Sequence, residues 1–199
     1  DNCDYIVVYL QDSFDTWYYC HQQIVDMRKE GTYDWREFIN KEYFPRVREA
    51  VEYLSKQEYT DRLVYCIYNE ADNGIWFGDF IDGNCVCTEE SRQNFYEAWK
   101  MTYDLVKSLD PDAKIGGPGY FDYDTAKITN FMSYCKENAC APEIMIYHEL
   151  STWSIPDWQK HVDDYRRIEK ELGISELPII VTEYGCMDDC GEPSRMLQY

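Results

Sequence analysis

The sequence predicts an α/β fold in which helices cover a parallel sheet, and three observations support this class. Short apolar runs of the kind found in buried strands alternate with longer segments whose apolar residues recur at helical spacing. Strict alternation is typical of parallel sheets, because each strand needs a crossover before the next parallel strand can pair with it. The chain has 199 residues, 45% of them hydrophobic, so it can bury a substantial core. We therefore expect a single domain over residues 1–199.

Five strands and four helices make up this prediction. The strands are expected at residues 5–10, 63–68, 114–119, 143–147 and 178–182, and the helices at 35–56, 91–109, 125–138 and 158–172. Pro45 is expected to divide the first helix, Ser91 to cap the second, and Gly173 to end the last. The strand KIGGPG at 114–119 is rich in glycine, which indicates close backbone packing or a β-bulge.

Charge and hydropathy exclude two classes of partner. The formal net charge of -19 and the pI near 4.4 repel nucleic acids and anionic lipid surfaces, which bind through clustered Lys and Arg. No run approaches the ~18 to 20 consecutive apolar residues of a membrane span. We expect neither nucleic acid nor a membrane as partner, and the sequence leaves the oligomeric state open.

The chain has nine cysteines, a high number for a cytosolic enzyme. Cys66 lies in an apolar strand and is expected to act as a small buried hydrophobe. The other eight predict several disulfides and a secreted or extracellular protein, although the sequence does not choose among their many pairings. They are Cys3, Cys20, Cys85, Cys87, Cys135, Cys140, Cys186 and Cys190. A zinc site is the rival interpretation, but C-V-C and C-M-D-D-C lack the usual ligand spacing. We predict no metal and no cofactor.

Two of the expected strands end in a carboxylate. Glu70 follows the strand at 63–68 in IYNEADN, and Glu183 follows the strand at 178–182 in TEYG. No phosphate-binding glycine motif follows any strand, which disfavours a nucleotide-binding open sheet. In a parallel barrel all strands open onto one face at their carboxyl ends, so the two glutamates would meet. Glycoside hydrolases use such a pair of carboxylates as catalytic groups. A single glutamate at a strand end is more often a solvated charge.

Four motifs, YNEAD, KIGGPGY, IYHELS and VTEYG, resemble in this order the fourth to seventh strands of a clan A glycoside hydrolase. The resemblance is strongest to family thirty-nine, the β-xylosidase and α-L-iduronidase group. It implies a TIM (β/α)8 barrel, of which this chain covers an incomplete portion, about strands 3 to 7, since a full barrel takes ~250 residues. It also implies Glu70 as general acid/base, Glu183 as nucleophile and Asn69 as a hydrogen-bond donor to the sugar 2-hydroxyl, with retention of configuration. Ala71 departs from the proline that many relatives carry there.

Further side chains are expected at the end of the barrel where the strands have their carboxyl ends, which we call the mouth. His148 ends its strand and should point into the mouth, either as a substrate contact or as a structurally satisfied histidine. Glu149 should face the other way, because successive strand residues alternate. Aromatic rings in the loops can form platforms for sugar faces, and about half of them should be ordinary packing. These rings belong to Trp76, Phe77, Tyr120, Phe121, Trp153 and Tyr184.

The expected mouth loops contain no Lys or Arg. They are residues 12–27, 71–91, 120–126, 149–158 and 184–194. An anionic sugar normally needs a cation to offset its desolvation, so we expect a neutral, β-xyloside-like sugar. The loop aspartates could instead hold calcium, but they lack a regular ligand spacing, and solvated charges are the simpler interpretation. These are Asp72, Asp79, Asp82, Asp188 and Asp189.

The sequence thus predicts a retaining glycoside hydrolase with a carbohydrate substrate. Two alternatives stay open: a carbohydrate-binding barrel that has lost turnover, and a disulfide-stabilised acidic interaction domain that binds a basic partner. The distance between the two carboxyl groups tests the hydrolase prediction: about 5 to 5.5 Å suits retention, about 6.5 to 9.5 Å suits inversion, and more than ~12 Å would exclude both.

Overall fold

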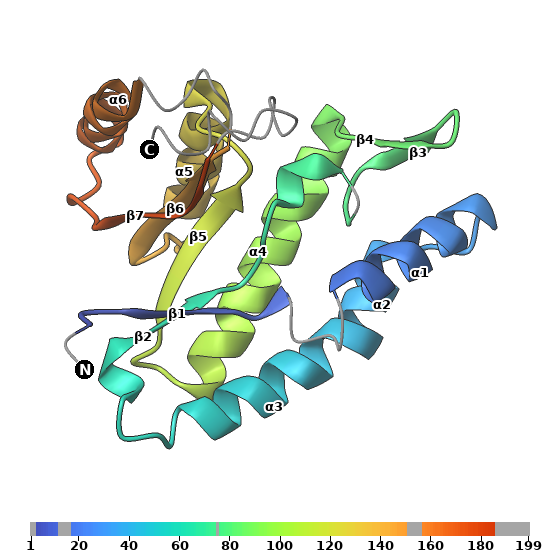
Figure 1. Ribbon diagram of the computed structural model, residues 1–199, viewed down its shortest axis with the longest axis horizontal. Coiled ribbons are helices and arrows are strands. Elements are labelled where there is room, and N and C mark those ends of the chain that lie inside the picture. The colour runs from blue at the N-terminus through green and yellow to red at the C-terminus, as the bar shows by residue number, and fades with distance from the viewer. Residues whose placement is uncertain (1–2, 12–16, 75, 151–156, 186–199) are drawn as a thin grey trace, which may run out of the picture.

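A computed structural model describes residues 3–11, 17–74, 76–150 and 157–185. Its main sheet has five parallel strands in the order β1-β2-β5-β6-β7, side by side in Figure 1. Their bounds are Ile6–Tyr9, Leu63–Cys66, Lys114–Tyr120, Ile144–Glu149 and Ile179–Tyr184. All five predicted strands are present, so the expected parallel α/β class is confirmed.

Helices connect the strands and cover the sheet on one side. They are α1 (Trp17–Lys29), α2 (Trp35–Phe38), α3 (Phe44–Leu54), α4 (Glu89–Leu109), α5 (Thr125–Glu137) and α6 (Trp158–Leu172). Each strand of the main sheet pairs with the next one along the chain. Successive right-handed crossovers in that order place all helices on the same face, as in a barrel, whereas a doubly wound sheet has helices on both faces. The described chain is therefore part of a (β/α) barrel, as predicted.

Several local predictions were wrong. Residues 12–27 were expected to be a loop, but α1 occupies Trp17–Lys29. Pro45 does not divide its helix, because a π-helical turn at Ile39–Tyr43 joins α2 to α3 and Pro45 lies in the first turn of α3, where proline is tolerated.

The region between β2 and α4 also differs from the prediction. Thr88, not Ser91, is the N-cap of α4; its side chain accepts from the Ser91 backbone and Ser91 reciprocates in a capping box. Just before it, β3 (Asp79–Ile81) and β4 (Asn84–Val86) form an antiparallel hairpin where a loop was expected. Gly173 does end α6, with φ +64.

Two apolar clusters lie on opposite faces of the sheet. On the helix side, Trp99 of α4 fills the space above Gly117, where a Cβ would lie 2.4 Å from the indole ring. The other face has a smaller cluster built from alternate residues of β2 and β6, with Val7, Tyr9 and Ile180 packed against it. Its buried members are Val64, Cys66, Ile144 and Ile146. This alternation fixes which strand residues can face the interior of a barrel.

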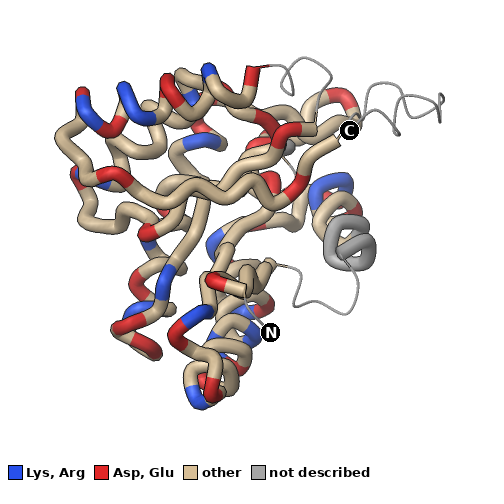
Figure 2. Tube along the Cα trace, turned by 60° about the vertical axis from the view of Figure 1, so that its left-hand side comes forward, with Lys and Arg blue, Asp and Glu red and all other residues tan. Residues whose placement is uncertain are grey.

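Charged residues lie mainly on the helices and connections, while the strands of the main sheet are largely uncharged (Figure 2). Among the described helices, none combines the length and the apolar character that crossing a bilayer requires.

Thiols are free at the six cysteines whose side chains the structure describes. Cys66 is one of them and is buried in β2, as predicted. The structure shows none of the expected disulfides among the other five, Cys3, Cys85, Cys87, Cys135 and Cys140. The side chain of Cys20 is not among those described, and Cys186 and Cys190 lie outside the described residues.

Candidate active site

Glu70 follows β2 in a backbone conformation that is rare for a residue with a side chain. Its φ and ψ are 48° and 40°, in the left-handed region. Such a residue costs about 1 to 3 kcal/mol and persists only where its surroundings impose it. Here the Glu70 N–H donates to the Gly119 carbonyl (2.7 Å), and the preceding Asn69 N–H donates to Gln11 Oε1 (2.8 Å). Bonds from the two neighbouring strands thus hold the Asn-Glu pair from both sides.

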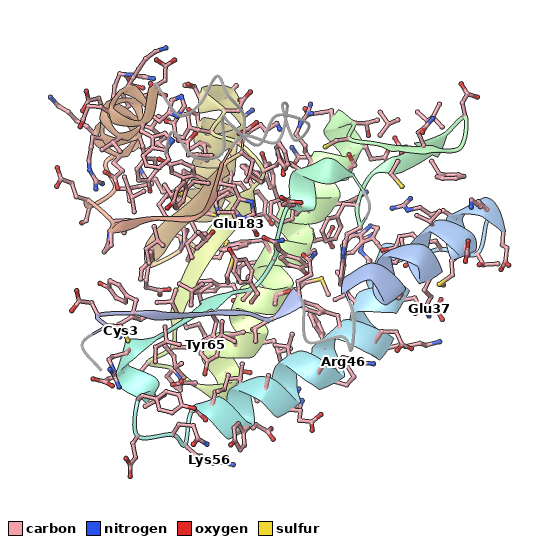
Figure 3. All side chains as sticks on the ribbon, in the orientation of Figure 1. Cys3, Glu37, Arg46, Lys56, Tyr65 and Glu183 are labelled. Carbon is pink, nitrogen blue, oxygen red and sulfur yellow. The ribbon has the colours of Figure 1, made fainter. Side chains whose placement is uncertain are left out.

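Glu183 owes its direction to a β-bulge. Tyr147 pairs with Val181, but Glu149 pairs with Tyr184, so β7 contains one more residue than β6 over this stretch. A bulge reverses the alternation of side chains. It turns Glu183 to the face on which His148 lies, while Tyr184 shares the helix side with Glu149. In Figure 3, Glu183 lies in the upper half of the view, away from Cys3 and Lys56 in the lower half.

His148 stands between the two glutamates. It is fully buried, its Nδ1 lies 3.2 Å from Glu70 Oε1, and its Nε2 lies 3.6 Å from Glu183 Oε1. One donor atom from each of the three side chains lies within 4.8 Å of the other two. The structure therefore brings together the three strand-end residues that the sequence placed at one mouth. The side chain of Glu70 is 15% exposed and that of Glu183 is 45% exposed, so the pair is open to a ligand from outside.

The same three side chains are a donor set of the kind that metals accept. Their geometry suits a bridge better, because the two ring nitrogens of His148 face different carboxylates and only one of them could reach a shared ion. Within the described chain, no other group of His, Cys, Asp and Glu side chains is close enough to ligate one ion.

Asn69 adds an unsatisfied polar atom beside the pair. The residue is 7% exposed, and its Oδ1 is buried with no hydrogen-bond partner among the described residues. Because a buried polar atom without a partner costs free energy, this amide is suited to a ligand. The oxygen and nitrogen of the amide exchange places on a simple flip, so either can face that ligand.

Asp72 braces the loop that follows Glu70. Its Oδ1 accepts from the Phe121 N–H (3.1 Å), and its Oδ2 accepts from Lys127 Nζ (2.8 Å). The side chain of Asp72 is only 7% exposed, so the expectation of a solvated charge is wrong at this position, and Asp72 is a buried acceptor that holds the loop. Lys127 of α5 lies one residue beyond the expected mouth loop at 120–126, which is why the sequence did not reveal it. Burial lowers the pKa of Lys127, but the charge and hydrogen bond of Asp72 outweigh it, so the pKa is raised and the lysine is held as a cation.

Three aromatic residues expected at the mouth lie in the helix-side core: Trp76, Phe77 and Tyr120. Trp76 is 5% exposed and packs against the ring of Tyr43, and Phe77 is 3% exposed. Tyr120 is 2% exposed and packs against Phe95. A bulge in β5 just before Tyr120 turns its ring away from the barrel interior. The structure therefore contradicts a platform role for all three.

Three aromatic predictions remain. Phe121 is half-buried, and its backbone N–H bonds to Asp72. Tyr184 is 63% exposed and meets Trp158 edge-on at 5.5 Å, on the helix side of β7. It flanks the mouth but does not share the face of Glu183. Trp153 lies outside the described residues.

Glu149 faces the helix layer, as expected, but it is fully buried. Its Oε1 lies 2.8 Å from His161 Nδ1 of α6, and the His161 ring stacks on Tyr123 at 4.5 Å. This second Glu–His pair links β6 to α6 on the helix side of the sheet, whereas His148 lies on the opposite face with Glu70 and Glu183.

Comparison with known proteins identifies glycosidases as relatives, although no family model matches the sequence. The chain is 27% identical to a 3-O-β-L-arabinopyranosyl-α-L-arabinofuranosidase of Bifidobacterium pseudocatenulatum, over 73% of this chain and 16% of that protein. It is 27% identical to a 3-O-α-D-galactosyl-α-L-arabinofuranosidase of Bifidobacterium longum subsp. longum, over 98% and 20%. A β-xylosidase of Geobacillus stearothermophilus is 22% identical over 48% and 22%. The chain thus spans about a fifth of the length of these curated relatives.

Two solved structures contain a region similar in fold to this chain. N2152 from Neocallimastix frontalis matches with a TM-score of 0.59 and 35% identity, over 73% of this chain and 33% of that one. A family 39 glycoside hydrolase from Xanthomonas axonopodis pv. citri matches with a TM-score of 0.54 and 15% identity, over 72% and 30%. At that identity the second likeness concerns the fold alone.

Proposed function

We propose that this chain, a relative of the clan A glycoside hydrolases close to family thirty-nine, carries the catalytic pair of a retaining glycosidase. The observation that carries the proposal is the approach of Glu70 and Glu183, whose nearest donor atoms lie within 4.8 Å of each other with His148 between them. Carboxyl groups of retaining enzymes lie about 5 to 5.5 Å apart, and those of inverting enzymes about 6.5 to 9.5 Å. An approach of one oxygen from each carboxylate to within 4.8 Å is the closeness that a retaining pair requires, and it supports retention.

We assign the roles of the two glutamates from the resemblance of their motifs, YNEAD and VTEYG, to those of family thirty-nine. Glu70 donates a proton to the leaving oxygen while Glu183 attacks the anomeric carbon and forms a glycosyl-enzyme. Glu70 then takes a proton from water, which releases the sugar with its original configuration. Asn69, immediately before Glu70, is placed to bond the sugar 2-hydroxyl.

His148 contacts the pair unequally. Its Nδ1 lies within hydrogen-bond distance of Glu70 Oε1 (3.2 Å), whereas its Nε2 is buried, 3.6 Å from Glu183 Oε1, and has no hydrogen-bond partner among the described residues. We infer that His148 positions Glu70 through Nδ1 and presents Nε2 toward Glu183.

The proposed substrate is a glycoside of a neutral pentose. Two relatives are named as α-L-arabinofuranosidases and one as a β-xylosidase, and both sugars are uncharged. Lys127, which braces the loop after Glu70, is paired with Asp72 and is not available to an anionic sugar. Arabinofuranosides should be tested as well as the expected β-xylosides, because the arabinofuranosidase relative matches 73% of this chain and the β-xylosidase relative 48%.

The test uses the full product of the gene and aryl glycosides of xylose, arabinofuranose and a uronic acid. We expect Glu183→Gln and Glu70→Gln to lower kcat by a factor on the order of 10² to 10⁴. The Glu70 variant should lose least on substrates with a good leaving group, because those need little protonation. Glu149→Gln is the matched control: it is a glutamate on the adjacent strand that faces away from the mouth, and it should keep activity within a few-fold. Unchanged turnover in Glu183→Gln would refute the assignment.

A further inference from the structure

Cys135 and Cys140 are brought together by the way α5 ends. The Cys140 N–H donates to the Cys135 carbonyl (2.9 Å), the Ala139 N–H donates to Lys136, and Ala139 has φ +51. This is a Schellman motif, which closes a helix by placing the residue after the left-handed one over the last helical turn. An apolar contact between those two positions usually accompanies it. In this chain both positions are cysteine.

The two thiols are enclosed by the helix-side core. Both residues are 0% exposed, and each thiol shifts the pKa of the other. Trp99 Nε1 donates to the Cys140 carbonyl (2.9 Å), which fixes the backbone of the turn. The helix-ending motif and the packing therefore place the two side chains beside each other.

We propose that Cys135 and Cys140, which are free thiols in this structure, are oxidised to a disulfide bond that fastens the end of α5 to the turn leading into β6. It is an inference beyond the proposed function and does not depend on it. Such a bond persists in an oxidising compartment, in agreement with the expected secreted or extracellular location.

The chemistry needs a two-electron oxidant, for which a small-molecule disulfide suffices. The Cys140 thiolate attacks one sulfur of oxidised glutathione and releases one glutathione. The Cys135 sulfur then attacks the mixed disulfide and displaces the second glutathione. The two cysteine sulfurs are oxidised, the glutathione disulfide is reduced, and the two thiol protons pass to the released glutathione. The hydrogen bond from Cys135 lowers the pKa of Cys140, and burial raises the pKa of Cys135, so Cys140 is the first nucleophile.

A tryptic digest tests the disulfide, because Lys136 lies between the two cysteines. Trypsin cuts after this residue and separates the cysteines into peptides 128–136 and 137–160. The reduced chain is equilibrated for hours with reduced and oxidised glutathione, since exchange at buried sulfurs waits for local opening. Free thiols are then alkylated under denaturation, and the chain is digested. We expect the two peptides joined, two hydrogen atoms lighter than their sum, and separated by reductant.

Two variants serve as controls. Cys140→Ser cannot form the link, whereas Cys66→Ser, which removes another buried thiol, should keep it. Peptides that carry separately alkylated or glutathionylated Cys135 and Cys140, or either cysteine joined to a third, would overturn the proposal.

Thermal unfolding gives an independent readout. The oxidised wild-type chain should unfold roughly 4 to 8 °C above the reduced chain, and Cys140→Ser should show no such difference. Equal midpoints for the two wild-type states would mean that the folded protein lacks the bond.

Discussion

Glu70 shows how one residue can be held in a costly conformation by bonds made elsewhere. Its left-handed backbone is fixed from one side by the carbonyl of Gly119 and from the other through Asn69 and Gln11. The sequence placed Glu70 at a strand end, but it contains no signal for this conformation. Gln11 was missed for the same reason: its role depends on a contact with a residue 58 positions away.

Gly119 is the residue whose replacement should disturb Glu70 most. It has φ +70, and a Cβ there would lie 2.4 Å from the Tyr68 carbonyl oxygen. We expect Gly119→Ala to lower the free energy of unfolding by roughly 2 to 5 kcal/mol, because strain and a backbone clash add. Gly83→Ala is the control, since Gly83 has φ +83 but open space around it, and it should cost only about 1 to 2 kcal/mol. Chemical denaturation measures both, and equal losses would mean that the clash is relieved without cost.

His148 was predictable as a residue of the mouth, but its place between two carboxylates was not. We expect His148→Gln to lower kcat of the gene product by about 10²-fold, with a smaller change in KM, because misplaced catalytic groups cost rate more than binding. The pH profile of kcat should change as well, because the substitution removes the ring nitrogen that lies 3.2 Å from Glu70 Oε1. An unaltered kcat and profile would show that His148 is only a packed residue.

At the scale of elements, strong patterns were read correctly and weak ones were not. The apolar stripe of α4 and the glycine that ends α6 identified those helices. The β3–β4 hairpin escaped notice because its strands have three residues each, although Asp82-Gly83, with φ +49 and +83, is a typical hairpin turn signal. The two bulges, at β5 and β7, depend on how neighbouring strands pair, so they decide the directions of Tyr120 and Glu183 without a clear mark in the sequence.

The end of α5 offers a test of the helix-capping account. Ala139 occupies the left-handed position at which glycine is preferred. Ala139→Gly should therefore raise the free energy of unfolding of the reduced chain by about 0.5 to 1 kcal/mol. Gly173→Ala, at the equivalent left-handed position after α6, should lower it by about 1 kcal/mol. Urea denaturation of both variants checks the signs, and a destabilised Ala139→Gly would contradict the assigned motif.

For the molecule as a whole, the order of strands and helices determined the fold prediction. Alternation in the sequence indicated a parallel sheet, and the order β1-β2-β5-β6-β7 makes that sheet a section of a barrel. The order also explains why residues 113 positions apart meet, because all strands deliver their carboxyl ends to one face. What the order could not specify was which aromatic rings face that opening.

The acidic composition predicts a property of the whole chain. With 38 acidic and 19 basic side chains, the folded state carries strong self-repulsion that salt screens. We expect the unfolding midpoint to rise by a few degrees, about 2 to 5 °C, between ~10 mM and ~500 mM sodium chloride. A fall in the midpoint would mean that the ion pairs contribute more to stability than the excess negative charge removes.

The stereochemistry of hydrolysis tests the central claim most directly, namely that Glu70 and Glu183 face each other at the spacing of a retaining pair. Proton NMR of the full gene product acting on an aryl pentoside identifies the anomer of the sugar that is released first, before mutarotation. The account predicts that this sugar has the configuration of the substrate. A first product of opposite configuration would contradict it, because inversion requires a water molecule between carboxyl groups that stand farther apart.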